Sequence, residues 1–597
     1  MIDKGEKRTM ILTDRQTDRQ TDRQTDRQTD RQTGYPSVDK PWLKYYEKGL
    51  DKEPFKGNLY EHVYCKNKEY LENKALQYYG RNISYGDLFH MVDKVAQVFL
   101  NYGIKSGDNI SLLMSSCPEM VYVLLGANRI GAIVNMVNPV FDDCQIRDRV
   151  NDSEADVLIV LDQLVKKIIG IQDELCVKHI VVVPIEQSMP TIIRFAAHHK
   201  LKKKISYTSR VLRWDDFVTK YSDGKCIEIT GSDENLPAIM VYSSGTTGAS
   251  KGIVLTNKGI NATVAHYEYT GFEYDRGDKY LQIIPTWFST GTVFCLVMPL
   301  CVGLQVILEP VFSEESFVRD IFKYKPNMIM GATSLWLHLM KTLQKEKKDL
   351  SFVTYPITGG EKMLPETEEE LNRLLNINGC KAHMATGYGM CELGSTVTST
   401  SAKYWKAGTT GYPILGVTVA AFDVNTSREC KYGERGEIRV LTPARMKEYY
   451  KRPDATAEFL WKDEEGREWG CTGDIGYIDQ DGFVYVQGRA SDFFINKAGK
   501  KVYCFDIEDE ILKVDEVYQC EVVSKASDEG YECPVAFVVL KEDVQKELKE
   551  VINSLEAYCS KHIEQASVPT EYIILDKFPV KASGKRDMEK LREMIGA

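Results

Sequence analysis

Helical and strand patterns alternate in the first third of this chain, and this alternation constrains the fold more than any other feature. The segment from residue 83 is an amphipathic helix whose apolar face holds Leu88, Met91, Val92, Val95, Val98 and Phe99. Gly103 ends this helix, and an apolar strand follows at Ile110–Met114. A second helix near Glu119–Ile130 and a second apolar stretch at Ala132–Val137 repeat the order. Such alternation is typical of an α/β fold.

The pattern changes twice toward the C-terminus. Beyond residue 405 the chain has short strands and glycine turns, as in GERGEIRVL and DGFVYVQGR. After Arg489 a mixed pattern includes a strong strand at Val535–Leu540 and a helix at Asp543–His562. Because 597 residues exceed what a single core organises, several domains are expected. We predict a large N-terminal domain of α/β subdomains with a small β-rich subdomain, then a small α+β C-terminal domain.

Composition excludes several classes of function. The net charge of −10 argues against nucleic-acid binding, which requires a basic excess. The fifteen cysteines form no C-x-x-C pair and the nine histidines no H-E-x-x-H pattern. A disulfide framework or a zinc site would show such spacing, so we interpret the cysteines as reduced thiols in a cytoplasmic protein.

One apolar run is long enough to be considered as a membrane span, namely GTVFCLVMPLCVGLQVILEPV from Gly291. Pro299, Gly303 and Gln305 interrupt it, and its flanks lack the aromatic or basic anchors of a span. We therefore predict a buried helix followed by a buried strand, and no transmembrane segment. The first residues, MIDKGEKRTMIL, lack the long apolar core of a secretory signal.

A repeat precedes the folded part. Residues 13–34 hold five copies of the unit Thr-Asp-Arg-Gln, which contains no apolar residue. Nothing in it can be buried, so residues 1–37 are expected to form a disordered tail. A four-nucleotide DNA repeat of ACAG, read in triplets, encodes the same four residues in the same order. The repeat is therefore better explained by the DNA than by a role in the protein.

A loop rich in glycine and hydroxyl groups stands out in MVYSSGTTGASKGIV, residues 240–254. It holds Ser243, Ser244, Gly245, Thr246, Thr247 and Gly248, and a single cation follows at Lys251. Apolar strands are expected on both sides, and Ser250 stands where a P-loop has glycine, so the P-loop reading fails. The exposed amides and hydroxyls still form a nest suited to an anion. The alternative is a polar loop without a ligand.

Six segments together resemble the motifs of the adenylate-forming superfamily, which includes acyl-CoA synthetases, adenylation domains and firefly luciferase. In chain order they are YSSGTTGASKG, GYGMCE, GTTGYPILG, CTGDIGYIDQDG, GRASDFF and KASGKRDMEKLR. The opening KPWLKYY at Lys40 resembles that of long-chain fatty-acid–CoA ligases. The resemblance runs from about residue 38 to the end of the chain.

The resemblance implies that ATP activates a carboxylic acid as an acyl-adenylate, with loss of pyrophosphate. In that scheme the loop from Ser243 to Lys251 binds the β- and γ-phosphates, and Glu392 holds Mg²⁺. Tyr388 and Gly389 would lie against adenine, with Gly360 and Glu361 nearby. Asp474 would accept hydrogen bonds from the ribose and Arg489 would donate to it. Lys585 would stabilise charge on the α-phosphate and the attacking carboxylate.

The second step implied by the resemblance explains the two-domain layout. After adenylation the small domain is expected to swing and admit the thiol of CoA. The boundaries expected on this basis are a tail at 1–37, a large adenylate-forming domain at 38–488, a hinge at 489–492 and a mobile C-terminal AMP-binding domain at 493–597. Ser491 and Asp492 are the candidate hinge positions.

Three features depart from the family pattern. One is FFINKAGKKV after the hinge, which is one residue longer than usual and has Asn496 where a lysine is common. The family usually has a threonine at the position of Cys391, and its hydroxyl contacts the α-phosphate. A thiol is a weaker hydrogen-bonding group, but we include Cys391 among the catalytic candidates. The family often has a histidine at the position of Phe288, in PTWFSTG.

The sequence therefore predicts an ATP-dependent, AMP-forming fatty-acid–CoA ligase of the cytoplasm. PTWFSTG lacks the aspartate that amino-acid activators carry there, which favours a simple acyl or aryl acid. One alternative loads an acyl carrier protein instead of CoA. The other is a degenerate, non-catalytic binder of acyl groups or nucleotides, although Lys585, Glu392 and Asp474 are all retained.

Overall fold

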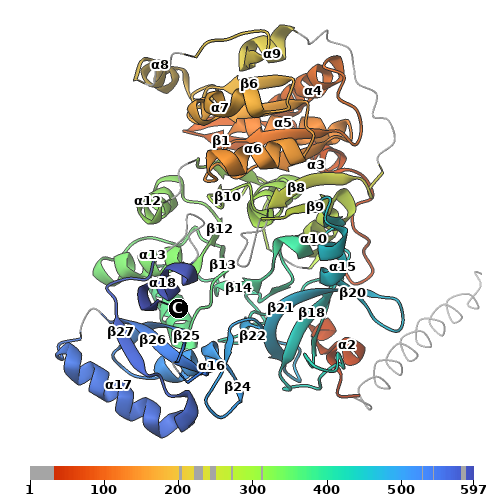
Figure 1. Ribbon diagram of the computed structural model, residues 1–597. Coiled ribbons are helices and arrows are strands. Elements are labelled where there is room, and N and C mark those ends of the chain that lie inside the picture. The colour runs from red at the N-terminus through yellow and green to blue at the C-terminus, as the bar shows by residue number, and fades with distance from the viewer. Residues whose placement is uncertain are drawn as a thin grey trace, which may run out of the picture.

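The computed structural model describes residues 33–46, 48–200, 205–220, 233–242, 250–270, 273–310, 313–527, 529–541, 544–579 and 586–596. Most of the predicted tail, the loop from Ser243 to Gly248, and Lys585 lie outside these residues. The chain folds into two large sheets, a smaller antiparallel sheet, and a C-terminal α+β part (Figure 1). The predicted fold class is confirmed.

The first large sheet has eight strands in the order β19-β9-β8-β4-β3-β5-β6-β7. Their bounds are β3 (Asn109–Leu113), β4 (Ile133–Met136), β5 (Val157–Leu161), β6 (His179–Val183), β7 (Val211–Arg213), β8 (Pro237–Tyr242), β9 (Gly252–Thr256) and β19 (Glu448–Tyr449). β3–β8 run parallel, and β9 and β19 are antiparallel additions at one edge. The edge that carries β9 and β19 also carries the candidate site.

The second large sheet has nine strands in the order β16-β15-β14-β13-β12-β10-β11-β1-β2. Their bounds are β1 (Lys74–Tyr78), β2 (Arg81–Ser84), β10 (Lys279–Gln282), β11 (Gln305–Leu308), β12 (Met328–Gly331), β13 (Tyr355–Gly359), β14 (Ala385–Tyr388), β15 (Thr398–Ser399) and β16 (Tyr412–Pro413). The central strands run parallel, so the carboxyl ends of β13 and β14 lie at one edge of the sheet. Tyr388 is the last residue of β14.

Helices fill the space between and around these sheets. They are α3 (Leu59–Asn67), α4 (Tyr85–Asn101), α5 (Pro118–Arg129), α6 (Asp143–Asp152), α7 (Val165–Ile171), α8 (Thr191–Lys200), α9 (Trp214–Lys220), α10 (Asn257–Tyr269), α11 (Met298–Cys301), α12 (Glu314–Tyr324), α13 (Thr333–Lys345) and α14 (Pro365–Ile377). Shorter turns are η1 (Pro41–Tyr45), η2 (Gln172–Glu174) and η4 (Cys391–Leu393). The predicted helix α4 starts at a capping box between Ser84 and Asp87 and buries five of its six predicted apolar positions, Met91 being partly exposed.

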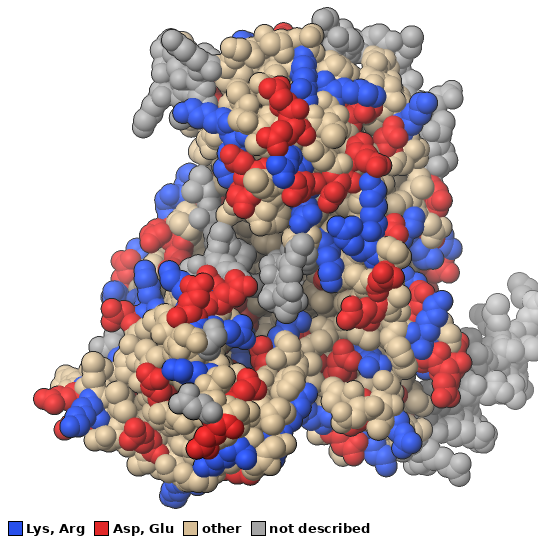
Figure 2. Space-filling model, viewed as in Figure 1, with Lys and Arg blue, Asp and Glu red and all other residues tan. Residues whose placement is uncertain are grey.

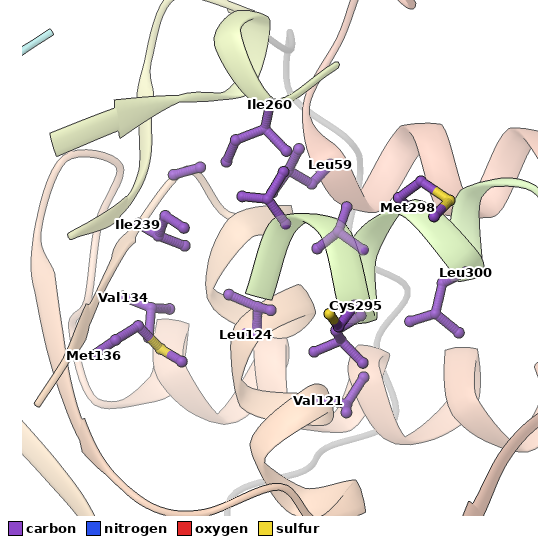
Figure 3. Close-up of a cluster of buried hydrophobic side chains, with 14 of the residues drawn as sticks. Leu59, Val121, Leu124, Val134, Met136, Ile239, Ile260, Cys295, Met298 and Leu300 are labelled. Atoms are coloured by element: carbon purple, nitrogen blue, oxygen red, sulfur yellow. The ribbon is translucent and has the colours of Figure 1, made fainter. Parts of the chain in front are cut away.

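The apolar run from Gly291 is a buried helix and strand, as predicted. It forms the π-helix η3 (Thr290–Val297), then α11 and β11, and all three are buried. Cys295 lies there beside Val121 and Leu124 of α5, in one buried cluster with Met298 and Leu300 (Figure 3). Among the described residues no helix is long and apolar enough to cross a membrane.

A smaller sheet forms the β-rich subdomain expected beyond residue 405. It contains β17 (Thr418–Phe422), β18 (Gly436–Leu441), β20 (Leu460–Lys462), β21 (Glu468–Ile478) and β22 (Val484–Arg489), with α15 (Pro453–Phe459) beside it. The neighbouring strands are antiparallel, which places β21 between β18 and β22.

The C-terminal part combines three helices with two small sheets. β23 (Phe493–Ile495) pairs with β24 (Lys501–Tyr503), and β25 (Val517–Ala526), β26 (Glu532–Leu540) and β27 (Glu571–Ile574) form a three-stranded sheet. The helices are α16 (Cys504–Ile511), α17 (Leu548–His562) and α18 (Met588–Ile595), with the turn η5 (Gln565–Ser567). The helix expected from Asp543 begins at Leu548 instead, after Glu547 at its N-cap.

The folded body begins before residue 38, where the large domain was predicted to start. Helix α2 (Pro36–Asp39) precedes η1, and Ser37 is buried with its hydroxyl donating to Glu429 at 2.6 Å. Trp42 and Tyr46 then pack against Tyr412 and Phe483 of the folded body. The predicted disordered tail is therefore too long by at least these few residues, because Ser37 is buried and hydrogen-bonded to Glu429.

Candidate functional site

The predicted strand-loop-strand around the glycine-rich loop is confirmed by its two flanking strands. β8 ends at Tyr242 and pairs antiparallel with β9, which starts at Gly252. The loop residues Ser243–Gly248 lie outside the described residues. Lys251, which follows them, places its Nζ 4.9 Å from the centre of the Tyr449 ring. A cation above an aromatic face is attracted to it, so the ring helps to hold Lys251 at the end of the loop.

Tyr449 also connects this edge to Glu392. The tyrosine hydroxyl donates to Glu392 Oε1 at 2.9 Å, and the carboxylate is only 7% exposed. Burial and the Glu392 charge raise the pKa of Tyr449, so the phenol stays protonated and donates. Tyr449 lies on β19, which pairs with β9 directly after the loop. Lys251, Tyr449 and Glu392 therefore form a contact chain across two sheets.

The turn that carries Glu392 requires glycine. A Cβ built on Gly389 would lie 1.6 Å from the carbonyl oxygen of Ser395, which no side chain tolerates. The chain can turn tightly there, directly between Tyr388 at the end of β14 and η4, which starts at Cys391. Cys391 is partly exposed. None of the fourteen described cysteines forms a disulfide bond with another of them.

Tyr388, Asp474 and Arg489 meet at a second point of the site. The Tyr388 hydroxyl donates to Asp474 Oδ2, and Arg489 Nε lies 3.2 Å from Asp474 Oδ1. Asp474 is 7% exposed, and burial together with its charge raises the pKa of Tyr388 well above the usual value. Arg489 also donates to the Thr472 carbonyl at 3.0 Å. Three predicted site residues from three strands are thus in direct contact.

Asp474 follows a bulge in β21 that side chains of β18 support. Gly473 has a φ of +67°, and its N–H donates to Glu437 Oε1 at 3.2 Å. The other Glu437 oxygen accepts from Arg439 Nε at 2.9 Å. The Arg439 guanidinium lies over both the Phe422 and the Trp461 ring, 4.9 Å and 4.6 Å from their centres.

Sequence reasoning missed this support and missed Tyr449. Glu437 and Arg439 are two residues apart in GERGEIRVL, so they share one face of a strand, which is a signal the sequence does carry. No comparable signal exists for Tyr449, because β19 has two residues and its partner Glu392 is 57 positions away.

Gly360 and Glu361 directly follow β13, the strand next to β14, in which Gly359 pairs with Gly387. Gly360 has a φ of +86°, and Glu361 Oε2 accepts from the Ser334 N–H at 3.0 Å. Glu361 also acts electrostatically on Arg586 of the C-terminal part. Burial lowers the pKa of Arg586, while the charges of Glu508 and Glu361 oppose that shift. No contact of Gly360 or Glu361 with Tyr388 or Asp474 is among the described interactions.

The C-terminal part meets the large domain through ion pairs. Lys362 Nζ lies 2.5 Å from Asp509, and Arg435 donates to Asp506 at 3.0 Å. Residues 490–492, within the predicted hinge, connect β22 to β23. Lys585, which precedes Arg586, lies outside the described residues.

Glu392 fits a magnesium ion that is held mainly by phosphate oxygens. Among the residues that the structure describes, no group of three His, Cys, Asp or Glu side chains could hold a metal ion alone. Mg²⁺ in nucleotide sites is usually bound through one or two carboxylates plus substrate phosphates. Glu392 is a single buried carboxylate, and its Oε1 accepts the hydrogen bond from Tyr449. One such carboxylate agrees with that arrangement.

Comparison with known families gives two matches. The profile of the AMP-binding enzyme family matches residues 65–450, and that of the AMP-binding enzyme C-terminal domain matches residues 506–585. The first match covers Lys251, Glu392 and Tyr449, and the two together leave a gap that contains Asp474 and Arg489.

Characterised relatives span nearly the whole chain at low identity. A long-chain-fatty-acid–CoA ligase of Bacillus subtilis (strain 168) is 26% identical over 564 residues, 93% of this chain and 98% of the relative. A 4-coumarate–CoA ligase of Pinus taeda is 26% identical over 513 residues, 84% of this chain and 88% of the relative.

Solved structures share the fold. An anthranilate CoA ligase, AuaEII, in complex with anthranoyl-AMP superposes with a TM-score of 0.77 at 20% identity, covering 92% of this chain and 99% of that one. ATP-bound MatB from Rhodopseudomonas palustris gives 0.77 at 20% identity, over 90% and 99%.

Proposed function

This chain belongs to the AMP-binding enzyme family, and on that premise we propose that it is a fatty-acid–CoA ligase. It would join a fatty acid to ATP as an acyl-adenylate, release pyrophosphate, and transfer the acyl group to CoA. The family assignment supports an AMP-forming acid–CoA ligase. That the acid is a fatty acid is the more specific part of the proposal.

One observation carries this proposal, namely a row of contacts along the candidate site. Lys251, Tyr449 and Glu392 form one half, and Tyr388, Asp474 and Arg489 form the other. Residues 388–392 are continuous in sequence and join the halves. A cation and an acid at one end suit phosphates and their metal ion, and an aromatic ring with a buried carboxylate suits a nucleoside.

In the first step, a carboxylate oxygen of the acid forms a bond to the α-phosphorus of ATP. The bond from that phosphorus to the bridging oxygen breaks, and pyrophosphate leaves with the electron pair. Both reactants are anions, so neutralising charge and fixing their positions supply most of the catalysis. Lys251 and Lys585 would provide positive charge, and Mg²⁺ held at Glu392 would neutralise phosphate charge when bound.

The nucleoside half of the substrate would be held by Asp474. Its buried carboxylate can accept hydrogen bonds from both ribose hydroxyls, and the contact with Arg489 Nε at 3.2 Å orients it. Tyr388 would present its ring to the adenine. Because the Tyr388 hydroxyl donates to Asp474, the ring and the carboxylate are fixed relative to each other.

In the second step the CoA thiol gives up its proton and attacks the acyl carbon of the adenylate. The carbon–oxygen bond to AMP breaks, so AMP leaves and a thioester remains. The C-terminal domain would change its position between the steps by rotation about residues 489–492. This hinge agrees with the short connection between β22 and β23.

Two observations favour a fatty acid over an aryl acid. The relative from Bacillus subtilis, named a long-chain-fatty-acid–CoA ligase, aligns over 93% of this chain. The KPWLKYY opening, which resembles fatty-acid ligases, is folded and buries Trp42 and Tyr46. Aryl acids are the leading competitor, because relatives named 4-coumarate–CoA ligases show the same identity.

The test is a substrate panel with two readouts. Pyrophosphate release and thioester formation would be measured for fatty acids of several lengths and for benzoate and coumarate, with CoA and with acyl carrier protein as acceptors. We expect the largest kcat/KM with a fatty acid and CoA. Preference for aryl acids would overturn the substrate assignment, and transfer only to carrier protein would overturn the acceptor. If neither the wild type nor Lys585→Ala released pyrophosphate with any acid, the result would support the non-catalytic alternative.

A further inference from the structure

A small cavity lies beside β8 and the start of β9. Its volume is about 40 Å³, which is room for roughly three water molecules. Four of its ten lining residues are cationic and one is acidic, namely Arg149, Lys251, Lys451, Arg452 and Asp152. The cations come from α6, from the residue before β9 and from the segment after β19, so the fold brings them together from three separate places.

The acids near this cavity do not balance its cations. Asp152 Oδ2 lies 3.4 Å from Arg149 Nη1, and the exposed Glu154 pairs with Lys451 Nζ at 2.8 Å. Four cations and these two acids leave an excess of two positive charges. Arg452 has no carboxylate within ion-pair distance among the described residues, and its Nη1 donates to the Lys451 carbonyl at 3.3 Å. Figure 2 shows Lys and Arg side chains gathered on the viewed face near the height of β9, with acidic side chains above them.

Arg149 is the most enclosed of these cations. Its side chain is only 13% exposed, and its buried Nε has no hydrogen-bond partner in the described part of the chain. The guanidinium lies 5.6 Å from the centre of the Tyr242 ring, and the Tyr242 hydroxyl donates to Asn135 Oδ1 at 2.7 Å. A buried N–H without an acceptor is costly, and a bound anion would supply the acceptor.

The cavity and Glu392 lie on opposite faces of this sheet edge. Tyr449 donates to Glu392, whereas the next residue, Tyr450, lines the cavity. Successive side chains along an extended chain point to opposite faces, and alternate ones share a face. Met240 and Tyr242 of β8, two positions apart, both line the cavity. The cavity is therefore separate from the part of the candidate site that contains Glu392.

From these observations we propose that the cavity binds one phosphoryl group of inorganic pyrophosphate, at a site separate from that of ATP. A guanidinium presents N–H donors in a geometry that matches phosphate oxygens, and the cavity is too small for a nucleoside. Pyrophosphate is the leaving group of the proposed first step, so the choice of this anion rests on the proposed function. Held there, it would be kept away from the acyl-adenylate, which it could otherwise convert back to ATP.

The experiment titrates the full-length protein with pyrophosphate by isothermal titration calorimetry at a fixed Mg²⁺ concentration. A saturating non-hydrolysable ATP analogue fills the candidate site during the titration. We expect one pyrophosphate still to bind per chain, and sulfate to bind more weakly because it carries less charge. No pyrophosphate binding beside the analogue, or sulfate binding that is equally tight, would overturn the proposal.

This titration needs neither an acid substrate nor turnover, so its result is independent of the substrate panel. A separate titration with the analogue alone shows whether the candidate site binds ATP. Failure of the proposed function and failure of the second anion site are thus distinguished.

Variants then assign the binding to the cavity. Arg149→Gln and Arg452→Gln should each weaken pyrophosphate binding about tenfold, because each removes a charged donor, while the affinity for the ATP analogue changes little. Arg147→Gln is the matched control, since Arg147 lies on the same helix and pairs instead with Asp148 and Glu174.

Two results with these variants would overturn the proposal. One is pyrophosphate binding that stays at the wild-type level in both cavity variants. The other is an equal loss of affinity for pyrophosphate and for the ATP analogue, which would mean that the cavity holds the terminal phosphate of ATP. Arg452 is exposed, so Arg452→Gln tests the site even if Arg149→Gln does not fold.

Discussion

Side chains of β18 support the bulge of β21 that contains Asp474. The Gly473 N–H donates to Glu437, and Glu437 is held by Arg439, whose guanidinium lies over the Phe422 and Trp461 rings. A carboxylate that binds two ribose hydroxyls, as proposed for Asp474, needs its orientation set within a narrow range. We therefore propose that Glu437 is a positioning residue for nucleotide binding.

Replacing Glu437 by alanine should raise the KM for ATP about tenfold with little change in kcat, because a hydrogen bond to a charged group contributes about 1.5 kcal/mol. The preference for ATP over 2′-deoxyATP should shrink at the same time, and Glu437→Gln should recover part of both effects. Steady-state kinetics with both nucleotides checks this, with exposed Glu464→Gln as control. A loss of stability with an unchanged nucleotide preference would mean that Glu437 is only structural.

Cys391 stands next to Glu392 and is partly exposed. If it faces the α-phosphate, Cys391→Thr should keep or raise kcat/KM, because a hydroxyl is the better hydrogen-bonding group. Saturating ATP should also slow alkylation of Cys391, followed by peptide mass spectrometry. Alkylation at the same rate with and without ATP would remove Cys391 from the site.

Glu119 is a buried acid outside the site whose protonation affects stability. It is 1% exposed, accepts the Ser188 hydroxyl at 2.5 Å, and burial raises its pKa to about 7. The folded pKa exceeds the unfolded one near 4.5, so the contribution to stability is complete below pH 4.5 and is lost as pH rises to about 7. The loss is at most about 3 kcal/mol.

Glu119→Gln removes this titration and can still accept from Ser188. We therefore expect the Tm of the variant, relative to that of the wild type, to be a few degrees higher at pH 8 than at pH 5. Thermal melts at both pH values check the difference, with exposed Glu464→Gln as control. A constant offset between variant and wild type at both pH values would contradict a raised pKa at Glu119.

At the scale of elements, the sequence predicted those that have a strong period and failed at the short ones. The amphipathic pattern of α4 and the apolar runs of β3 and β4 are long enough to be recognised, and the structure confirms them. The two-residue strand β19 has no period at all. The site followed the same rule, since motif residues such as Asp474 and Glu392 were predicted while Tyr449, placed by β19, was not.

Helix α16 presents two acids to the large domain. Asp506 pairs with Arg435 and Asp509 with Lys362, while Arg586 lies within electrostatic reach of Glu361. We propose that this arrangement of the two domains is the one used for adenylation. The two pairs are exposed, so each contributes at most about 1 kcal/mol.

Removing both acids, as Asp506→Asn with Asp509→Asn, should lower the rate of adenylate formation about two- to fivefold. Thiolysis of supplied acyl-adenylate should stay the same or rise, because the C-terminal domain is released from this position. Single-turnover assays of the two half-reactions check the split, with exposed Asp515→Asn as control. An equal loss in both half-reactions would show that α16 does not select between the two positions.

At the scale of the whole molecule, the N-terminal segment fastens to subdomains far along the chain. Thr33 contacts Asp39, Ser37 bonds to Glu429, and Trp42 and Tyr46 pack against Tyr412 and Phe483. The repeat before Thr33 contains no apolar side chain that could add to this packing. The prediction of a passenger tail can therefore hold only for the residues before Thr33, where these contacts begin.

Two truncations separate the repeat from the fastened segment. Deleting residues 1–32 removes polar, net-neutral repeat units, and we expect Tm and turnover to stay at the full-length values. Deleting residues 1–46 also removes buried Trp42 and Tyr46, and the loss of one such aromatic side chain costs about 3–5 kcal/mol. We therefore expect the longer deletion to lower Tm by about 5 °C or more. Calorimetry and turnover on the two proteins check the boundary. If the shorter deletion were as damaging as the longer one, the repeat itself would have to dock on the folded body.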